Sequence, residues 1–216
     1  MRLLAFADIH GAYDRVEHVL RREEHYDAVV IAGDLTARGT EDEVTDVLER
    51  FGRHGRPLFV VAGNMDAPSF DGLFDSLGVG INGRGVLLHD IGFFGVSGSP
   101  FTRMHTPYEI SEQEIAARSE RGFRDVQNAR MTVFVPHAPP HMSAVDTILF
   151  GKHVGSTAVR NFIARHVPNV VVCGHIHEAR GLDQIGPSQV VNCGPALAGS
   201  YAVVTIEQTV HIELKG

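Results

Sequence analysis

Cysteine is scarce in this 216-residue chain, which contains only Cys173 and Cys193. Two cysteines cannot build a disulfide framework, and the lack of a CxxC pair argues against a zinc site made of thiolates. Cys173 ends the apolar run Val170–Val172, where a small buried thiol is the usual interpretation. A chain of this length can instead bury a sizeable hydrophobic core.

Long apolar runs are also missing. No stretch approaches the ~18 residues that a membrane-spanning helix requires. The chain reaches Asp8 too early for its start to read as a secretory signal peptide. We therefore expect a soluble, cytoplasmic protein with no membrane partner.

The third absence is a cluster of positive charge. Lys and Arg total 19 against 26 Asp and Glu, which gives a formal net charge of -7, and the basic residues are scattered. A surface for long nucleic acid needs basic residues on one face, so we expect no duplex nucleic acid partner. Hydrophobic residues make up 44% and charged residues 21%, which is ordinary globular usage. Nothing resembles a linker or an internal repeat, and the sequence predicts a single domain over residues 1–216.

Short apolar runs alternate with amphipathic stretches, a pattern typical of an α/β sheet protein. The expected strands are residues 3–7, 28–32, 58–62, 86–88, 93–96, 131–135, 170–173, 201–206 and 210–214, the last two as a hairpin. Helices are expected after the capping residues Thr40, Ser111 and Ser156, and over residues 14–25.

Residues that can bind metal follow five of these strands. Because the carboxyl ends of strands in α/β sheets converge on one edge where ligands bind, these residues are expected to lie together. They are Asp8, His10, Asp34, Asn64, His137, His175 and His177.

The spacing and chemistry of these residues indicate a metal site. Side chains two apart in extended chain point the same way, so Asp8 and His10 can bind one ion together, as can His175 and His177. Nitrogen and oxygen ligands without thiolate suit Mn, Fe, Zn, Co or Ni. The set is too large for one ion, and a carboxylate such as Asp34 can bridge two ions ~3.5–4 Å apart. Such a pair activates a bridging water near neutral pH and clamps the phosphoryl oxygens of an ester.

The ordered motifs D-x-H, G-D, G-N, H and G-H-x-H resemble those of the calcineurin-like metallophosphoesterase superfamily, and the match spans residues 8–177. The resemblance implies a four-layer αββα sandwich of two mixed β-sheets flanked by helices. It also implies two metal ions that share Asp34. One ion would be held by Asp8, His10, Asp34 and His177, and the other by Asp34, Asn64, His137 and His175. His10, Asn64 and His175 are the expected catalytic positions.

One position departs from the commonest form of these motifs. Many members read G-N-H-[DE], where the His aids the phosphate or protonates the leaving group, whereas this chain has Met65 followed by Asp66. A thioether has no proton to donate, so that role is vacant or is filled elsewhere. Asp66 is expected to anchor the loop. Arg103 or His105 could contact the phosphate or replace the proton donor, and His141 and the loop 151–156 could line the pocket or serve only as ordinary loop residues.

The leading hypothesis is a dinuclear-metal-dependent phosphoesterase, with manganese as the favoured metal and a small phosphodiester, for example a nucleotide, favoured over a phosphomonoester. The alternative is a catalytically inactive or regulatory binding scaffold of the same fold. The sequence leaves the oligomeric state open, with a homodimer as one option.

Overall fold

Three parallel strands and a C-terminal antiparallel pair form the first sheet of the computed structural model, which describes residues 1–216. The sheet order is β15-β14-β1-β2-β3, with β14 antiparallel to both of its neighbours. The strands are β1 (Arg2–Phe6), β2 (Ala28–Ala32), β3 (Leu58–Val61), β14 (Tyr201–Ile206) and β15 (Val210–Lys215).

The second sheet is also mixed, in the order β12-β13-β11-β8-β5-β4. Its four inner strands are parallel, and the two edge strands β4 and β12 are antiparallel to their neighbours. The strands are β4 (Gly85–Leu88), β5 (Ile91–Val96), β8 (Met131–Pro136), β11 (Val170–Cys173), β12 (Gly181–Ile185) and β13 (Ser188–Asn192). Two short pairs lie outside the sheets: β6 (Ser99–Pro100) with β7 (Glu109–Ile110), and β9 (Thr147–Ile148) with β10 (Lys152–His153).

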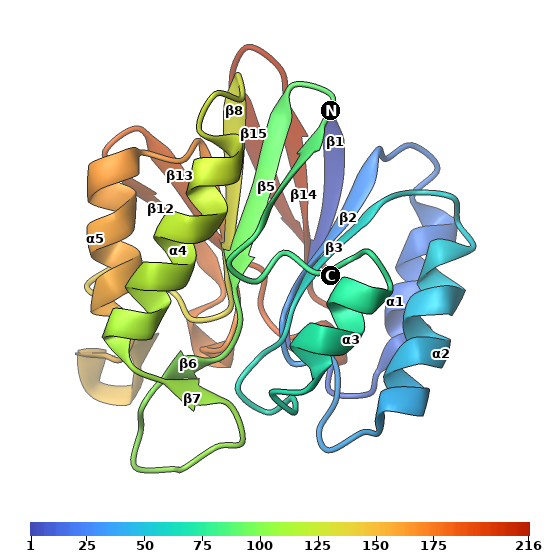
Figure 1. Ribbon diagram of the computed structural model, residues 1–216, viewed down its shortest axis with the longest axis horizontal. Helices are drawn as coiled ribbons and strands as arrows, with labels where there is room; N and C mark the ends of the chain where they lie inside the picture. Colours follow the sequence, from blue (N-terminus) through green and yellow to red (C-terminus); the bar gives the residue numbers. More distant parts are fainter.

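Five helices cover the outer faces of the two sheets (Figure 1), so the layer order is helix, sheet, sheet, helix. The first sheet is covered by α1 (Tyr13–Arg22), α2 (Glu41–Gly52) and α3 (Phe70–Ser76), and the second by α4 (Glu112–Val126) and α5 (Thr157–His166). Three short 3₁₀ turns are η1 (Leu149–Gly151), η2 (His177–Ala179) and η3 (Ala196–Ala198). The expected class, a sandwich of two mixed sheets flanked by helices, is confirmed.

The hydrophobic core consists of three layers because each strand alternates its side chains between two faces. In β1, Leu3 and Ala5 pack between the sheets, whereas Leu4 and Phe6 pack against the helices α1 and α2. The rings of Phe59 and Phe93 stack across the two sheets with their centroids 4.0 Å apart. This packing fixes one sheet against the other and thereby brings their strand ends together.

The predicted capping residues start their helices. The Thr40, Ser111 and Ser156 side chains each accept a hydrogen bond from the backbone N–H three residues later. The helix expected over residues 14–25 is shorter, since α1 ends at Arg22 and the next residue, Glu23, is extended. The Glu23 carboxylate binds the side chains of Arg2 and Tyr201, which lie far away in the sequence. Those contacts end the helix early.

Candidate metal centre

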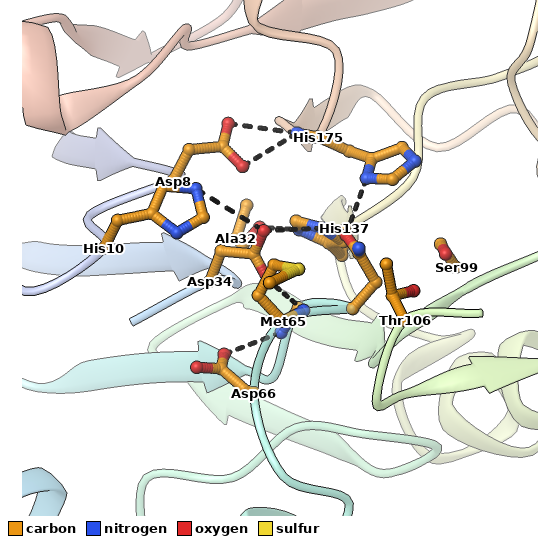
Figure 2. A network of polar contacts seen from close by, with 12 residues as sticks. Asp8, His10, Ala32, Asp34, Met65, Asp66, Ser99, Thr106, His137 and His175 are labelled. Carbon is orange, nitrogen blue, oxygen red and sulfur yellow. Dashed lines mark hydrogen bonds and ion pairs between the residues drawn. The ribbon is translucent and has the colours of Figure 1, made fainter. Parts of the chain in front are cut away.

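Five strands end at one edge of the sandwich, and each is followed by one or two of the seven predicted site residues. The pairs are β1 with Asp8 and His10, β2 with Asp34, β3 with Asn64, β8 with His137, and β11 with His175 and His177. Figure 2 shows Asp8, His10, Asp34, His137 and His175 gathered in one group. The two sheets therefore bring together side chains that are up to 169 positions apart in the chain.

Much of this group is buried. Asp8 and His137 are 0% exposed, Asp34 is 2% exposed and Asn64 is 5% exposed. The His10 and His177 side chains remain accessible, with 15% and 41% of their surface exposed. The site thus has a closed inner part and an open side at which a substrate can enter.

The backbone at these positions is unusual. Asp8, His10, Asp34 and His175 all have left-handed φ values, between +46° and +70°, which non-glycine residues adopt at a cost. Backbone hydrogen bonds hold two of these turns together, from Asp8 N to Gly33 O at 3.0 Å and from His10 N to Asp34 O at 2.9 Å. Neighbouring loops thus stabilise a conformation that aims the side chains inward.

Gly63 allows the loops after β2 and β3 to approach each other closely. A Cβ at this position would overlap the Asp34 side chain, and it would lie 2.3 Å from the Asp34 backbone nitrogen. Because only a residue without a side chain fits there, the loop after β3 can pack directly on the loop after β2.

Asp34 lies between two imidazoles. Its Oδ2 atom is 3.6 Å from Nε2 of His10 and 3.6 Å from Nε2 of His137. His177 Nε2 is 3.6 Å from Asp8 Oδ1 and 3.4 Å from His10 Nε2. The ligand atoms of two triads, Asp8 with His10 and His177, and Asp8 with Asp34 and His137, lie within 4.8 Å of one another. These two groups, which share Asp8, are candidate places for a metal ion.

Asn64 and His175 complete the inner part of the group. The Asn64 Oδ1 atom lies 2.7 Å from Nδ1 of His175 and 2.9 Å from Nε2 of His137. His137 Nδ1 lies 2.8 Å from the carbonyl oxygen of Ala32, which turns its Nε2 atom toward the group. Asn64 therefore lies beside the two histidines with which it is expected to bind a metal ion.

Asp66 anchors the loop, as the sequence predicts. Its carboxylate accepts hydrogen bonds from the backbone N–H groups of Leu35, Thr36 and Gly63. The backbone N–H of Met65 donates to Asp34 Oδ1 at 2.8 Å, so Met65 lies next to the group but brings a thioether to it (Figure 2). Arg103 and His105, the other candidates for substrate contact, are exposed on the loop that joins β6 to β7.

Burial and crowding of like charges shift the acid–base behaviour of the group. Burial raises the pKa of Asp34 to about 7, and the nearby carboxylates of Asp66 and Asp8 act in the same direction. Burial also lowers the pKa of His175 to about 3, with His137 adding to the effect. Burial acts to raise the pKa of Asp8 too, but its contacts with His177 and His137 hold that pKa below its ordinary value. A divalent cation would stabilise the ionised carboxylates and the neutral imidazoles, so this donor set fits a metal.

The model of the calcineurin-like phosphoesterase family matches residues 1–179. The chain belongs to this family. It is 32% identical over 199 residues to the uncharacterized protein MJ1162 of Methanocaldococcus jannaschii, a match that covers 90% of this chain and 88% of that protein. Members of the family generally hydrolyse phosphate esters with the help of bound metal ions. Membership in the family therefore identifies the chain as a metal-binding phosphoesterase.

Solved structures share the fold at low sequence identity. The protein TT1561 of Thermus thermophilus superimposes with a TM-score of 0.79 at 17% identity, covering 100% of this chain and 98% of that one. An archaeal phosphodiesterase superimposes with a TM-score of 0.58 at 14% identity, with complete coverage of both chains. None of the helices in the structure has both the length and the apolar character that crossing a membrane requires.

Proposed function

We propose that the chain is a dinuclear-metal-dependent phosphoesterase that acts on a small phosphate ester. The observation that carries this proposal is the position of the Asp34 carboxylate, 3.6 Å from the imidazoles of both His10 and His137. Asp34, a member of the buried triad, thereby also lies next to a histidine of the open triad. Seven nitrogen and oxygen donors around two adjacent positions are more than a single ion uses.

The residues divide between the two ions as the family resemblance implies. Asp8, His10, Asp34 and His177 would hold one ion, and Asp34, Asn64, His137 and His175 the other. Bound there, a pair of divalent cations supplies a nucleophile near neutral pH and neutralises charge on the phosphoryl group. Manganese is our preferred metal, and Fe, Zn, Ni and Co are alternatives that a set of imidazole and carboxylate ligands also suits.

The protein's own groups prepare the site for this chemistry. Asp66 and the Gly63 backbone hold the loop that carries Asn64, and the Ala32 carbonyl orients His137. The buried inner residues exclude water from one side of the site, whereas His10 and His177 lie on the open side. An ester could therefore approach the site from the side of these two histidines.

Met65 favours a phosphodiester over a phosphomonoester. The thioether cannot protonate a leaving group, and a diester held by two cations is strongly electrophilic and needs less help at this step. The resemblance to the archaeal phosphodiesterase extends only to the fold, so the preference for a diester depends on Met65.

The substitution Met65→His tests this preference. It restores a proton donor, and we expect the rate for phenyl phosphate, whose leaving group departs poorly without a proton, to rise relative to that for diphenyl phosphate by up to ~100-fold if the new imidazole acts as a general acid. Met65→Leu, which fills similar space without a proton, serves as the control. An unchanged ratio in Met65→His would contradict the preference, and no Mn²⁺-dependent hydrolysis of either ester by the unmodified protein would favour the inactive scaffold instead.

A further inference from the structure

A second polar cluster lies on the segment that joins β8 to α5, and it consists of His141, Asp146 and His153. Asp146 Oδ1 is 2.6 Å from Nδ1 of His153, and Asp146 Oδ2 is 3.5 Å from Nδ1 of His141. The two imidazole rings are 6.0 Å apart and nearly perpendicular. Asp146 is fully buried, whereas each histidine side chain keeps about a third of its surface exposed. None of the three belongs to the predicted metal site.

The carboxylate of Asp146 is held rigidly. It accepts hydrogen bonds from the backbone N–H groups of Met142, Ser143 and Gly155, at 2.9 to 3.2 Å. Burial acts to raise the pKa of Asp146, but these hydrogen bonds and the contact with His153 hold it below its ordinary value. Asp146 therefore keeps its negative charge and fixes the orientation of the His153 ring.

This cluster lies beside the candidate metal centre. Its segment begins directly after His137, and β9, which pairs with the strand that carries His153, packs against η2, which starts at His177. The Asn192 side chain joins the two regions, because its amide donates to the carbonyl oxygens of Val145 and Ile176. The segment that carries the histidine pair thus packs against the turn that begins with His177, a residue of the open side of the centre.

The chemistry of the cluster suits an anion. With Nδ1 facing Asp146, Nε2 is the ring atom that each histidine has left for a ligand. The buried charge of Asp146 balances a protonated ring, so such a ring can donate an N–H to an anion without adding net charge to the interior. His141 Nδ1 is buried and has no hydrogen-bond partner, so a small rotation of its ring can improve its contact with Asp146.

Two basic side chains next to the histidine pair favour the binding of an anion there. Lys152, one of only two lysines in the chain, is exposed next to His153. The Arg160 guanidinium donates to the carbonyl of Met142, next to His141. The nearby acids Asp183 and Glu112 are fixed by hydrogen bonds from the backbone N–H groups of Ala144, Thr157 and Ala158. Lys152 and Arg160 therefore bring positive charge next to the pair.

We propose that His141 and His153 form a subsite for a second anionic group of the substrate. The enzyme then selects phosphate esters that carry a further phosphate or carboxylate, with the ester at the metal centre and the second group at this pair. The inference rests on the proposed function and adds the substrate class to it.

The test uses binding rather than turnover. Calorimetry on the full-length, Mn²⁺-loaded protein compares alkyl monophosphonates with α,ω-bisphosphonates and ω-carboxyalkyl phosphonates of two to eight carbons. We expect one chain length to bind about 10-fold tighter than the monophosphonate of equal length, since a charge-assisted hydrogen bond contributes on that scale. The bisphosphonate and carboxylate series show which anion the subsite prefers.

Three variants distinguish recognition of the second anion from a purely structural role of the histidines. His141→Asn and His153→Asn are expected to lose the gain from the second anion and to keep the affinity for the monophosphonate. His166→Gln is the matched control, because His166 also pairs with an acid, Glu120, at 2.8 Å, but lies at the end of α5. This variant is expected to keep the gain.

Two outcomes overturn different claims. If the monophosphonate binds but a second anion gives no gain at any length, the subsite is wrong and the proposed function stands. The same conclusion follows if both asparagine variants keep the full gain and unfold at the temperature of the unmodified protein. If even the monophosphonate fails to bind in a Mn²⁺-dependent way, the proposed metal centre itself is wrong.

Discussion

The two edges of the sandwich differ sharply, although the same strands build both (Figure 1). Nine non-glycine residues have a left-handed backbone, and only two of them, His89 and Val167, lie at the edge where the parallel strands begin. The other seven are in the loops at the edge where these strands end: Asp8, His10, Asp34, His105, Met142, Phe150 and His175.

Charge follows the same division. The edge where strands end buries Asp8, Asp34 and Asp66, whereas a groove at the opposite edge is lined by apolar residues such as Leu58, Leu77 and Val86. Buried carboxylates and unfavourable backbone both cost stability, and they coincide at one edge. The edge where the parallel strands end thus carries the backbone strain and buried charge expected of a binding site, whereas the opposite edge shows ordinary apolar packing.

The largest expected effect comes from removing one charge at the edge with the metal centre. Asp34→Asn keeps the shape of the side chain and can still accept the N–H of Met65, but it removes the negative charge of the proposed shared ligand. We expect Mn²⁺-dependent hydrolysis to fall by at least ~100-fold, since even groups that only orient ligands typically account for ~10- to 100-fold. Initial rates with bis(4-nitrophenyl) phosphate measure this.

Asp90→Asn is the matched control at the opposite edge, where Asp90 is exposed and pairs with Arg130. It should retain full activity, because an exposed ion pair of this kind contributes little. Equal losses in the two variants would remove the distinction between the edges.

Titration of the metal-free protein gives the next largest effect. The pKa of Asp34, raised to about 7, favours the folded state below its unfolded value of 3.8, and this advantage is lost as the pH rises through 7. Asp34→Asn should therefore gain stability over the unmodified protein between pH 4 and pH 7, by up to about 4 kcal/mol. Urea unfolding across this range, with chelator present, measures the difference.

His175 should show the opposite slope. Its pKa, lowered to about 3, gives stability that is present above 6.5 and is lost as the pH falls toward 3. His175→Asn should therefore gain over the unmodified protein on acidification. Parallel curves for the two variants and the unmodified protein would show that these groups are not buried together as described.

A comparison within the metal edge is expected to give a smaller effect. His137 is fully buried and His177 is accessible, so His137→Ala should weaken the binding of one Mn²⁺ ion and also lower the free energy of unfolding. His177→Ala should weaken Mn²⁺ binding alone, by ~10- to 100-fold. Calorimetric Mn²⁺ titration and urea unfolding of both variants give the two quantities, and equal losses of stability would contradict the division into inner and open parts.

The smallest effect is expected at the edge where the parallel strands begin, away from the proposed metal centre. Val167 ends α5 with φ +51°, a conformation that a β-branched residue adopts poorly and glycine adopts readily. Val167→Gly should stabilise the protein by up to about 1 kcal/mol in urea unfolding, with unchanged hydrolysis. A destabilised variant would mean that the Val167 side chain, rather than its backbone, matters at this turn.

The sequence predicts the parts of the fold that depend on short-range patterns. Apolar runs and capping residues identify every parallel strand except β13 and the starts of α2, α4 and α5, because those signals lie within a few residues. The sequence does not predict the hairpin of β12 and β13, since β12 is an edge strand with polar residues such as Asp183 and Gln184. It does not predict the seven-residue helix α3 either, because this helix is short and contains Gly72.

At the site, too, the sequence identifies some residues and not others. Asp8, Asp34 and His137 could be selected from the sequence because each follows an apolar strand, and parallel strands place such residues together. Asp146 and Asn192 could not, because Asp146 lies in a loop and Asn192 is the last residue of a missed strand. The partners of Asp146 lie within its own irregular loop, and Asn192 contacts Val145 and Ile176 only in the folded protein. The resemblance implies Asp34 as the shared ligand, and its position between two imidazoles agrees with that, although Asp8 and not Asp34 is the residue common to both triads.

The central claim is that the strand-end edge holds two cations at once. Elemental analysis after Mn²⁺ loading and removal of free metal, combined with hydrolysis rates at increasing Mn²⁺, tests it most directly. We predict two ions per chain and a rate that rises to its maximum only when the second ion binds. A chain that reaches full activity with one ion, or that retains none, would contradict this account.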